Sequence, residues 1–156
     1  MLFRSLFYRK DFLALVIDPL KDAALDPNTA VLIVDLLIFC MHNHGFLIKY
    51  YILRTNALHK VLGLLRRRER WAACAAVRFL RQCMGTKDDF YLRHITKNSA
   101  ILPVLEAYER NAGRRNLLDS AVLEMIDFIA HQKPSGILEH LVEKHAEKLR
   151  GLGGAF

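Results

Sequence analysis

The chain repeats itself at a spacing of about 43 residues, and this repeat limits the folds that it can adopt. The stretch LIKYYILRTNALHKVLGLL, which begins at Leu47, aligns with FYLRHITKNSAILPVLEAY, which begins at Phe90. The apolar pairs in this alignment are Ile52 with Ile95, Ala57 with Ala100, Leu58 with Ile101, Val61 with Val104, and Leu62 with Leu105. A helical repeat of this length is typical of armadillo and HEAT proteins, whose units cover each other's apolar faces. We therefore predict an all-α, armadillo/HEAT-like helical repeat solenoid, an architecture that mostly binds other proteins.

Apolar residues recur at helical spacing along most of the chain, and Gly45, Gly85 and Pro134 end some of the helical segments. Asp18 and Asp26 each precede a proline and are typical of a helix N-cap with proline at the first helical position. We expect a single armadillo-like repeat domain over residues 1–150, cut from a longer protein, and a flexible tail over residues 151–156. The predicted helices cover residues 3–16, 27–43, 46–54, 57–67, 69–84, 87–96, 100–111, 116–131 and 136–150.

The composition is that of a globular chain, with 53% hydrophobic and 25% charged residues. The longest apolar run, from Ala30 to Met41, contains Asp35 and is shorter than the roughly 20 residues that a membrane-spanning helix needs. The three cysteines stand in helical, apolar surroundings, so we expect no disulfide framework and a reducing, intracellular compartment. The sequence thus predicts a globular protein that does not cross a membrane.

The net charge is +7, and the basic residues are concentrated in RRRER, from Arg66 to Arg70, and in the segment that follows. Such a surface suits an acidic protein segment, a phosphorylated peptide or a nucleic acid. In a simpler interpretation the arginines only form a solvated convex face of the repeats. The charge pattern leaves these alternatives open.

The longest helix of each predicted repeat carries a polar stripe at helical spacing. The stripe consists of Arg70, Cys74, Arg78 and Arg81 in the first repeat, and of Asn116, Ser120, Glu124, Asp127 and His131 in the second. The repeat alignment places Arg78 over Glu124 and Arg81 over Asp127, so ion pairs between neighbouring repeats are expected. These pairs form either a ladder that stabilises the stack or part of a groove whose arginines bind acidic or phosphorylated groups.

The sequence contains none of the common catalytic motifs: no Gly-x-Ser-x-Gly, no glycine-rich phosphate loop and no His-Glu-x-x-His. Cys40 and His44 could share a helix face, but no further ligands follow at a suitable spacing, so a buried cysteine is favoured over a metal site. His140 and His145 lie on a charged helix and are expected at the surface. We predict that the protein is not an enzyme and needs no metal or other cofactor.

Several segments of the chain resemble one known family. AVRFLRQCMGTKDDFYLRHITKN, from Ala76 to Asn98, is similar to a segment of the SMEK/Falafel family, and FLRQCMGTKDDFY within it is highly specific. The resemblance continues in HNHGFLIKYYILRTNALHKVLGLL from His42, RRNLLDSAVLEMIDFI from Arg114 and LEHLVEKHAEKL from Leu138. Members of this family are regulatory subunit 3 of protein phosphatase 4, and the resemblance implies their central, armadillo-like Smk-1 domain.

The resemblance implies a non-catalytic regulatory and scaffolding domain of a serine/threonine protein phosphatase 4 complex. The implied partners are the catalytic subunit of phosphatase 4, its second regulatory subunit and other proteins that bind the repeat surface. The implied location is the nucleus and the cytoplasm. Phosphatase chemistry, with its metal ions, would then belong to the catalytic subunit and not to this chain.

The residues that we predict to contact partners are family-like positions and basic or polar residues of the stripes. They are Lys49, Arg70, Arg78, Arg81, Lys87, Tyr91, Arg93, Arg115, Asn116, Ser120 and Glu124. For Asn116, and for the family-like Asn98, helix capping is the alternative to partner contact.

A second class of function stays open, namely a basic helical module that binds nucleic acid or acidic or phosphorylated peptides. No aromatic stacking surface is interleaved with the basic residues, and this disfavours nucleic acid as a partner. Fragments of repeat proteins often expose apolar ends, so self-association of the chain is a further alternative.

Overall fold

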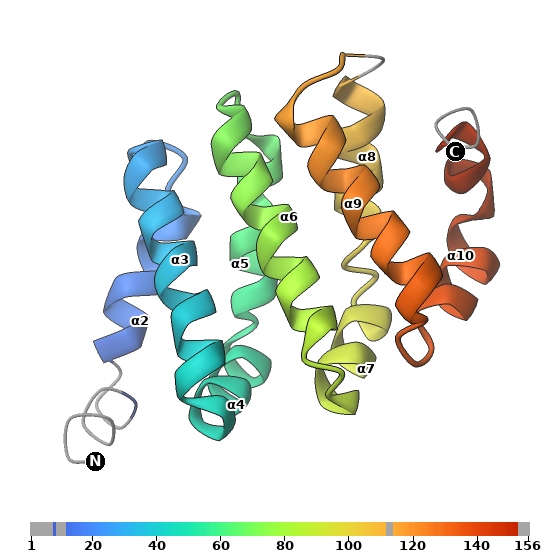
Figure 1. The fold of residues 1–156 in the computed structure, drawn as a ribbon. Coiled ribbons are helices and arrows are strands. Elements are labelled where there is room, and N and C mark those ends of the chain that lie inside the picture. Colours follow the sequence, from blue (N-terminus) through green and yellow to red (C-terminus); the bar gives the residue numbers. More distant parts are fainter. Residues whose placement is uncertain (1–7, 9–11, 112–113, 153–156) are drawn as a thin grey trace. The chain divides into compact units, whose positions relative to one another are not determined.

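The computed structural model describes residue 8 and residues 12–111 and 114–152. Within these residues the secondary structure consists of α-helices and short 3-10 helices without β-strands, which confirms the predicted all-α class (Figure 1). The chain packs as two compact units, Met1–Leu80 and Arg81–Phe156. The start of the helix predicted over 3–16 and most of the predicted tail lie outside the described residues.

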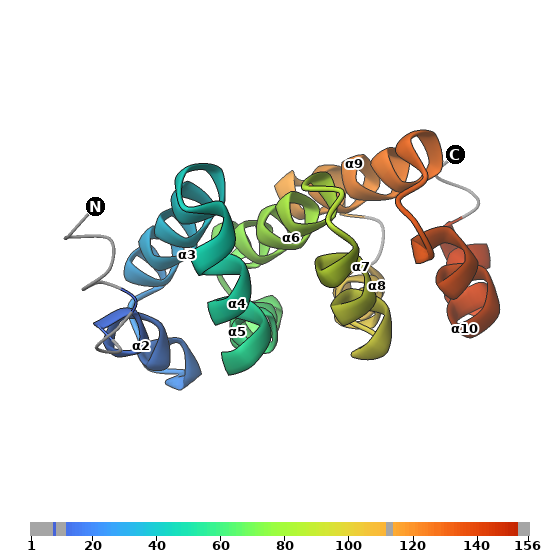
Figure 2. The same cartoon turned by 90° about the horizontal axis from the view of Figure 1, so that it is seen from below.

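The first unit is built from short helices and one long helix. It contains α2 (Phe12–Ile17), the 3-10 helix η1 (Asp18–Lys21), α3 (Pro27–Asn43), α4 (Gly45–Thr55), α5 (Ala57–Leu62), the 3-10 helix η2 (Gly63–Arg66) and most of α6 (Arg70–Gly85). The long helix α3 starts as predicted, because the Asp26 carboxylate accepts a hydrogen bond from the backbone N–H of Thr29 at 3.2 Å. Along the chain α3 packs on α4, and α4 packs on α5 (Figure 2).

The second unit contains the end of α6, α7 (Asp89–Lys97), α8 (Leu102–Asn111), α9 (Leu117–Gln132) and α10 (Ile137–Leu152). Helices α8 and α9 lie side by side, and both α7 and α9 contact α10 (Figure 1). Asp88 caps α7 by accepting a hydrogen bond from the backbone N–H of Phe90 at 2.9 Å. The predicted helices from residue 27 onward begin and end within about two residues of the observed ones, the usual uncertainty of a helix boundary, with one exception. The α-helix predicted over 57–67 ends at Leu62 and continues as the 3-10 helix η2.

The apolar positions that match between the two sequence repeats are buried in both copies. Ile52 and Ile95 expose 0% and 1% of their surface, and Val61 and Val104 expose none. The remaining matched positions are buried as well: Ala57, Leu58, Leu62, Ala100, Ile101 and Leu105. Burial of a Val, Leu or Ile side chain stabilises a fold by about 1.5–3 kcal/mol, so the repeated pattern marks the cores of the two units.

The prediction of an N-cap at Asp18 is wrong. Helix α2 runs directly into η1, with Ile17 in a right-handed helical conformation, so no new helix start needs a side-chain cap. The Asp18 carboxylate instead accepts a hydrogen bond from the Lys60 ammonium at 3.2 Å and thereby joins η1 to α5.

Candidate partner-binding surface

Three side chains from α6 and α9 form a polar and aromatic cluster on the surface of the second unit. Arg81 donates a hydrogen bond from its Nε to Oε1 of Glu124 at 3.3 Å. The same guanidinium lies 3.7 Å from the centre of the Phe128 ring, which is one helical turn beyond Glu124 on α9. Side-chain exposures of 32% for Arg81 and 59% for Glu124 leave this cluster open to a partner.

Lys87 lies at the rim of a small cavity that also reaches Phe128. The cavity has a volume of about 190 Å³ and is lined by Lys87, Asp89, Leu92, Phe128, Gln132, Lys133, Pro134 and Ser135. Phe128 lines this cavity, and the Arg81 guanidinium stacks on the Phe128 ring. The cluster and the cavity therefore form one continuous surface. We call Arg81, Lys87, Glu124 and Phe128 the α6–α9 surface.

The alignment-based prediction of which carboxylate each arginine meets needs a correction. Arg78 forms its ion pair with Asp35 of α3 at 3.6 Å, and Arg81 forms its pair with Glu124 and not with Asp127. Asp127 is instead 3.1 Å from the His131 ring on the same helix. Equivalent positions of two repeats need not face each other, because a neighbouring helix is shifted along its axis. The observed Arg81–Glu124 pair differs from the predicted pairing by one turn.

Most of the other predicted contact residues are exposed but do not form a single group. Lys49 is half-buried, and its ammonium lies 4.8 Å from the Phe46 ring centre on α4. Arg93 covers the Phe90 ring at 4.9 Å on α7. The remaining predicted residues with exposed side chains are Arg70, Arg115 and Ser120.

The expectation that Tyr91 is exposed is wrong. Tyr91 exposes only 4% of its surface on α7, and burial, together with Cys83 and Asp88, raises the pKa of its phenol. Its ring therefore belongs to the core of the second unit and is not accessible to a partner. Of the two neighbouring aromatic residues in KDDFY, Phe90 is the exposed one, at 52%.

Asn116 has a structural role, as the capping alternative predicts. Its Oδ1 accepts hydrogen bonds from the backbone N–H of Asp119 and from Nδ2 of Asn111, each at 3.1 Å. Its own Nδ2 donates back to Oδ1 of Asn111 at 2.9 Å. Asn98 likewise ends α7, donating from Nδ2 to the carbonyl of His94 at 2.8 Å.

The predicted surface position of His145 is also wrong. His145 exposes 8% of its surface, and its ring meets the His140 ring edge to face with a centroid distance of 5.3 Å. The backbone of α10 leaves helical geometry at His145, with φ −130° and ψ 25°. Burial, followed by the proximity of His140 and Lys148, lowers the pKa of His145. A helix break turns an outward position inward, and a helical period cannot reveal such a break.

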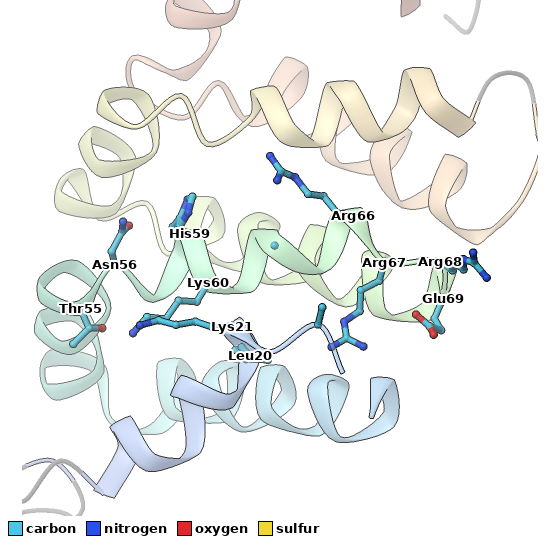
Figure 3. A pocket seen from close by; sticks show the side chains of 12 residues that line it. Leu20, Lys21, Thr55, Asn56, His59, Lys60, Arg66, Arg67, Arg68 and Glu69 are labelled. Carbon is cyan, nitrogen blue, oxygen red and sulfur yellow. The ribbon is translucent and has the colours of Figure 1, made fainter. Parts of the chain in front are cut away.

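A larger, basic cavity in the first unit was not predicted. Its volume is about 910 Å³, and its walls come from η1, α5, η2 and the chain around them (Figure 3). Five lining side chains are cationic and one is anionic, namely Lys21, Lys60, Arg66, Arg67 and Arg68 against Glu69. The RRRER run indicated a concentration of positive charge in this part of the sequence. The sequence did not indicate that Lys21 of η1 would line the same cavity as these arginines. We call this cavity the basic pocket.

Two further features of the described residues bear on function. No group of three or more His, Cys, Asp or Glu side chains in this part of the chain is arranged to hold a metal ion. Among the helices that the structure describes, none has the length and apolar character to span a membrane.

Comparisons with known proteins point to one family. The family model of phosphatase 4 regulatory subunit 3 matches residues 3–153. Serine/threonine-protein phosphatase 4 regulatory subunit 3 of Drosophila melanogaster is 35% identical over 116 residues, which cover 74% of this chain and 12% of that protein. Protein PPP4R3C1 of Mus musculus is 33% identical over 111 residues, which cover 71% of this chain and 14% of that protein. No solved structure matches the chain.

Proposed function

Because the chain belongs to the family of phosphatase 4 regulatory subunit 3, we propose that it is a regulatory and scaffolding element of a serine/threonine protein phosphatase 4 complex. The family is that of a regulatory subunit and not of a catalytic enzyme, as the sequence analysis expects. The observation that carries the proposal is the family match over residues 3–153. The aligned segments span only 12% and 14% of the lengths of the two relatives, so the role proposed here is that of this helical part.

The finer architecture that we propose is an armadillo/HEAT-like stack of helical repeats. The buried matches between the two sequence repeats support it, because each copy places Ile, Ala, Leu and Val at equivalent core positions. Polar contacts over the same sequence spacing also support it: Lys60 with Asp18 in the first unit and Arg81 with Glu124 in the second are separated by 42 and 43 residues.

The proposed partners are the catalytic subunit of phosphatase 4, its second regulatory subunit and other proteins that dock on the helices. The α6–α9 surface is the first candidate contact, since it combines an exposed aromatic-stacked arginine with Lys87 and a cavity that one partner side chain can enter. Residence in the nucleus and the cytoplasm is part of the same proposal. Self-association of the chain is the competing use of this surface.

A pull-down of the purified chain with the catalytic and second regulatory subunits, at about 0.15 M ionic strength, tests this proposal. The wild-type chain is expected to retain both subunits. The double variant Arg81→Glu with Lys87→Glu is expected to weaken retention by about tenfold or more, because charge reversal puts like charges against the partner at a partly desolvated contact.

The matched control is Arg114→Glu with Arg150→Glu, which changes the net charge equally at two exposed positions outside the α6–α9 surface. The control is expected to bind as the wild type does. If the wild-type chain retains neither subunit, the proposed scaffolding role of these helices is wrong. If the contact variant retains both subunits as fully as the wild type and the control do, the role stands and the contact lies elsewhere.

A further inference from the structure

The basic pocket concentrates more positive charge than the contacts of the fold neutralise. Lys60 is paired with Asp18 at 3.2 Å. Arg67 is held by two backbone carbonyls, donating from Nη1 to Leu25 at 2.6 Å and from Nη2 to Asp22 at 3.0 Å. These contacts fix the wall of the pocket, and Figure 3 shows Arg67 turned toward the chain that follows η1. Carbonyl acceptors leave the charge of the Arg67 guanidinium uncompensated.

Three more cations at the pocket have no ion pair within the described residues. Lys21, Arg66 and Arg68 are exposed and make no salt bridge, and Glu69 is the sole carboxylate among the described residues that line the cavity. Keeping such like charges close together costs free energy. An anionic segment that entered the pocket would relieve this repulsion and would find charged donors along the pocket wall.

We propose that the basic pocket binds a phosphorylated segment of a partner protein. A phosphoserine or phosphothreonine carries a charge of about −1.5 to −2 and three acceptor oxygens, which suit a guanidinium donor. Arg66 and Arg68 offer two such donors, and Figure 3 shows that they point to different sides of the pocket, so each would meet a separate phosphate. The volume of about 910 Å³ accommodates a short peptide segment together with its phosphate. Thr55 and Asn56 at the wall add neutral groups that can hydrogen-bond a peptide backbone.

The pocket suits a peptide better than a nucleic acid. Apart from His59, none of the described residues that line it has an aromatic ring on which a base could stack. Glu69 would also repel a continuous phosphate backbone, whereas it tolerates a single phosphate held on the other side of the pocket. The choice of a phosphorylated protein as the ligand rests on the proposed function, since a phosphatase complex handles phosphorylated chains.

Fluorescence anisotropy with a labelled Gly-Gly-Ser-Gly-Ser-Gly-Gly peptide, phosphorylated on both serines, tests the proposal on the purified chain. Unphosphorylated peptide, a peptide with glutamate in place of both serines, and a labelled oligouridine RNA serve as comparison probes. We expect the phosphorylated peptide to bind at least about tenfold more tightly than the other three. We also expect inorganic phosphate to compete only at concentrations well above that of the peptide.

The pocket variant is Arg66→Glu with Arg68→Glu, and Arg114→Glu with Arg150→Glu is the control of equal charge. The pocket variant is expected to lose about tenfold or more of the affinity for the phosphorylated peptide, and the control to keep it. Equal thermal unfolding by circular dichroism must accompany the comparison. Lys21→Ala, at an exposed position of η1, provides a milder second variant in case the double reversal does not fold, and it is expected to weaken the same binding.

Several outcomes would overturn the proposal. Equal binding of the glutamate or the unphosphorylated peptide would remove the role of phosphate, and equal losses in the pocket and control variants would mean that net charge alone is responsible. Tighter binding of the RNA, lost in the pocket variant, would assign the pocket to nucleic acid. Competition by inorganic phosphate at the concentration of the peptide would mean that the pocket binds anions in general and does not recognise the peptide. Since the assay contains no phosphatase subunit, its failure is distinguishable from failure of the pull-down.

Discussion

At the scale of single residues, the buried imidazole of His145 links the stability of the second unit to pH. Its ring lies against His140, and the nearby Lys148 ammonium pairs with Glu109 of α8 at 3.0 Å. Burial is the largest cause of the lowered pKa of His145, and the two neighbouring bases add to it. His94 on α7 has a lowered pKa for a similar reason, burial and the charge of Lys97.

Stability should therefore fall as the pH drops below the ordinary histidine pKa of about 6.5. In that range the unfolded chain binds a proton that folded His145 does not bind until a lower pH, so the free energy of unfolding decreases. We predict that His145→Phe, which keeps a ring in place, reduces the loss of Tm between about pH 7.5 and about pH 5. Circular dichroism melts at several pH values measure the difference.

His42→Gln is the control for this prediction, because His42 is exposed on α3. It should leave the pH dependence of Tm unchanged. A pH dependence as steep in His145→Phe as in the wild type would show that other groups, such as the carboxylates or His94, govern the acid range.

The exposed pair of Arg81 and Glu124 should contribute little to stability. Pairs of this kind are worth about 0.2–1 kcal/mol, because water screens the charges and both side chains lose freedom. We predict a coupling free energy in this range from a double-mutant cycle with Arg81→Gln and Glu124→Gln, measured by urea unfolding. Arg81→Gln alone should cost more than Glu124→Gln, since it also removes the contact with the Phe128 ring. A coupling well above this range would make the pair a structural ladder and not a contact surface.

At the scale of secondary structure, the cap of α9 is predicted to be worth more than any exposed ion pair. Asn116→Ala removes the acceptor for the Asp119 N–H and leaves Oδ1 of buried Asn111 without its donor. Nδ2 of Asn111 keeps its hydrogen bond to the Arg114 carbonyl. We expect a loss of about 2 kcal/mol in the free energy of unfolding, from the lost cap and the unpaired buried Oδ1 of Asn111 together. Urea unfolding followed by circular dichroism measures it.

Asn28→Ala is the matched control, because Asn28 is exposed in the first turn of α3 and its side chain has no hydrogen bond within the described residues. It should change stability by less than about 0.5 kcal/mol. Equal effects of the two substitutions would mean that the Asn111–Asn116 amide pair does not hold the start of α9.

The helices of this chain were largely predictable because their signals are local. Asp26 with Pro27 marks the start of α3, and Asn116 marks the start of α9, by chemistry that acts within one turn. Asp18 carries the same local signal, yet it bonds Lys60, because the preceding helix continues through it. The break at His145 escaped prediction for a similar reason, since burial among neighbouring helices, and not the local sequence, fixes it.

At the scale of the whole molecule, the sequence repeat predicted which positions form the cores but not the division of the chain. Positions such as Val61 and Val104 are buried as the alignment requires. The boundary between the compact units follows Leu80, inside α6, where the helical period continues without interruption. The basic pocket could not be predicted either, since Lys21 and Arg66 come to line one cavity only after η1 and η2 have packed together. The helical period of apolar residues within one segment carries no information about contacts with distant segments.

We propose that these helices by themselves carry the contact between a regulatory subunit and phosphatase 4. Size-exclusion chromatography with light scattering, on the purified chain mixed with the catalytic and second regulatory subunits at about 0.15 M ionic strength, tests it most directly. We expect one peak whose mass is that of the combined subunits, and the loss of this peak with Arg81→Glu and Lys87→Glu. Separate peaks for the chain and the phosphatase subunits, with a chain that is folded by circular dichroism, would contradict it.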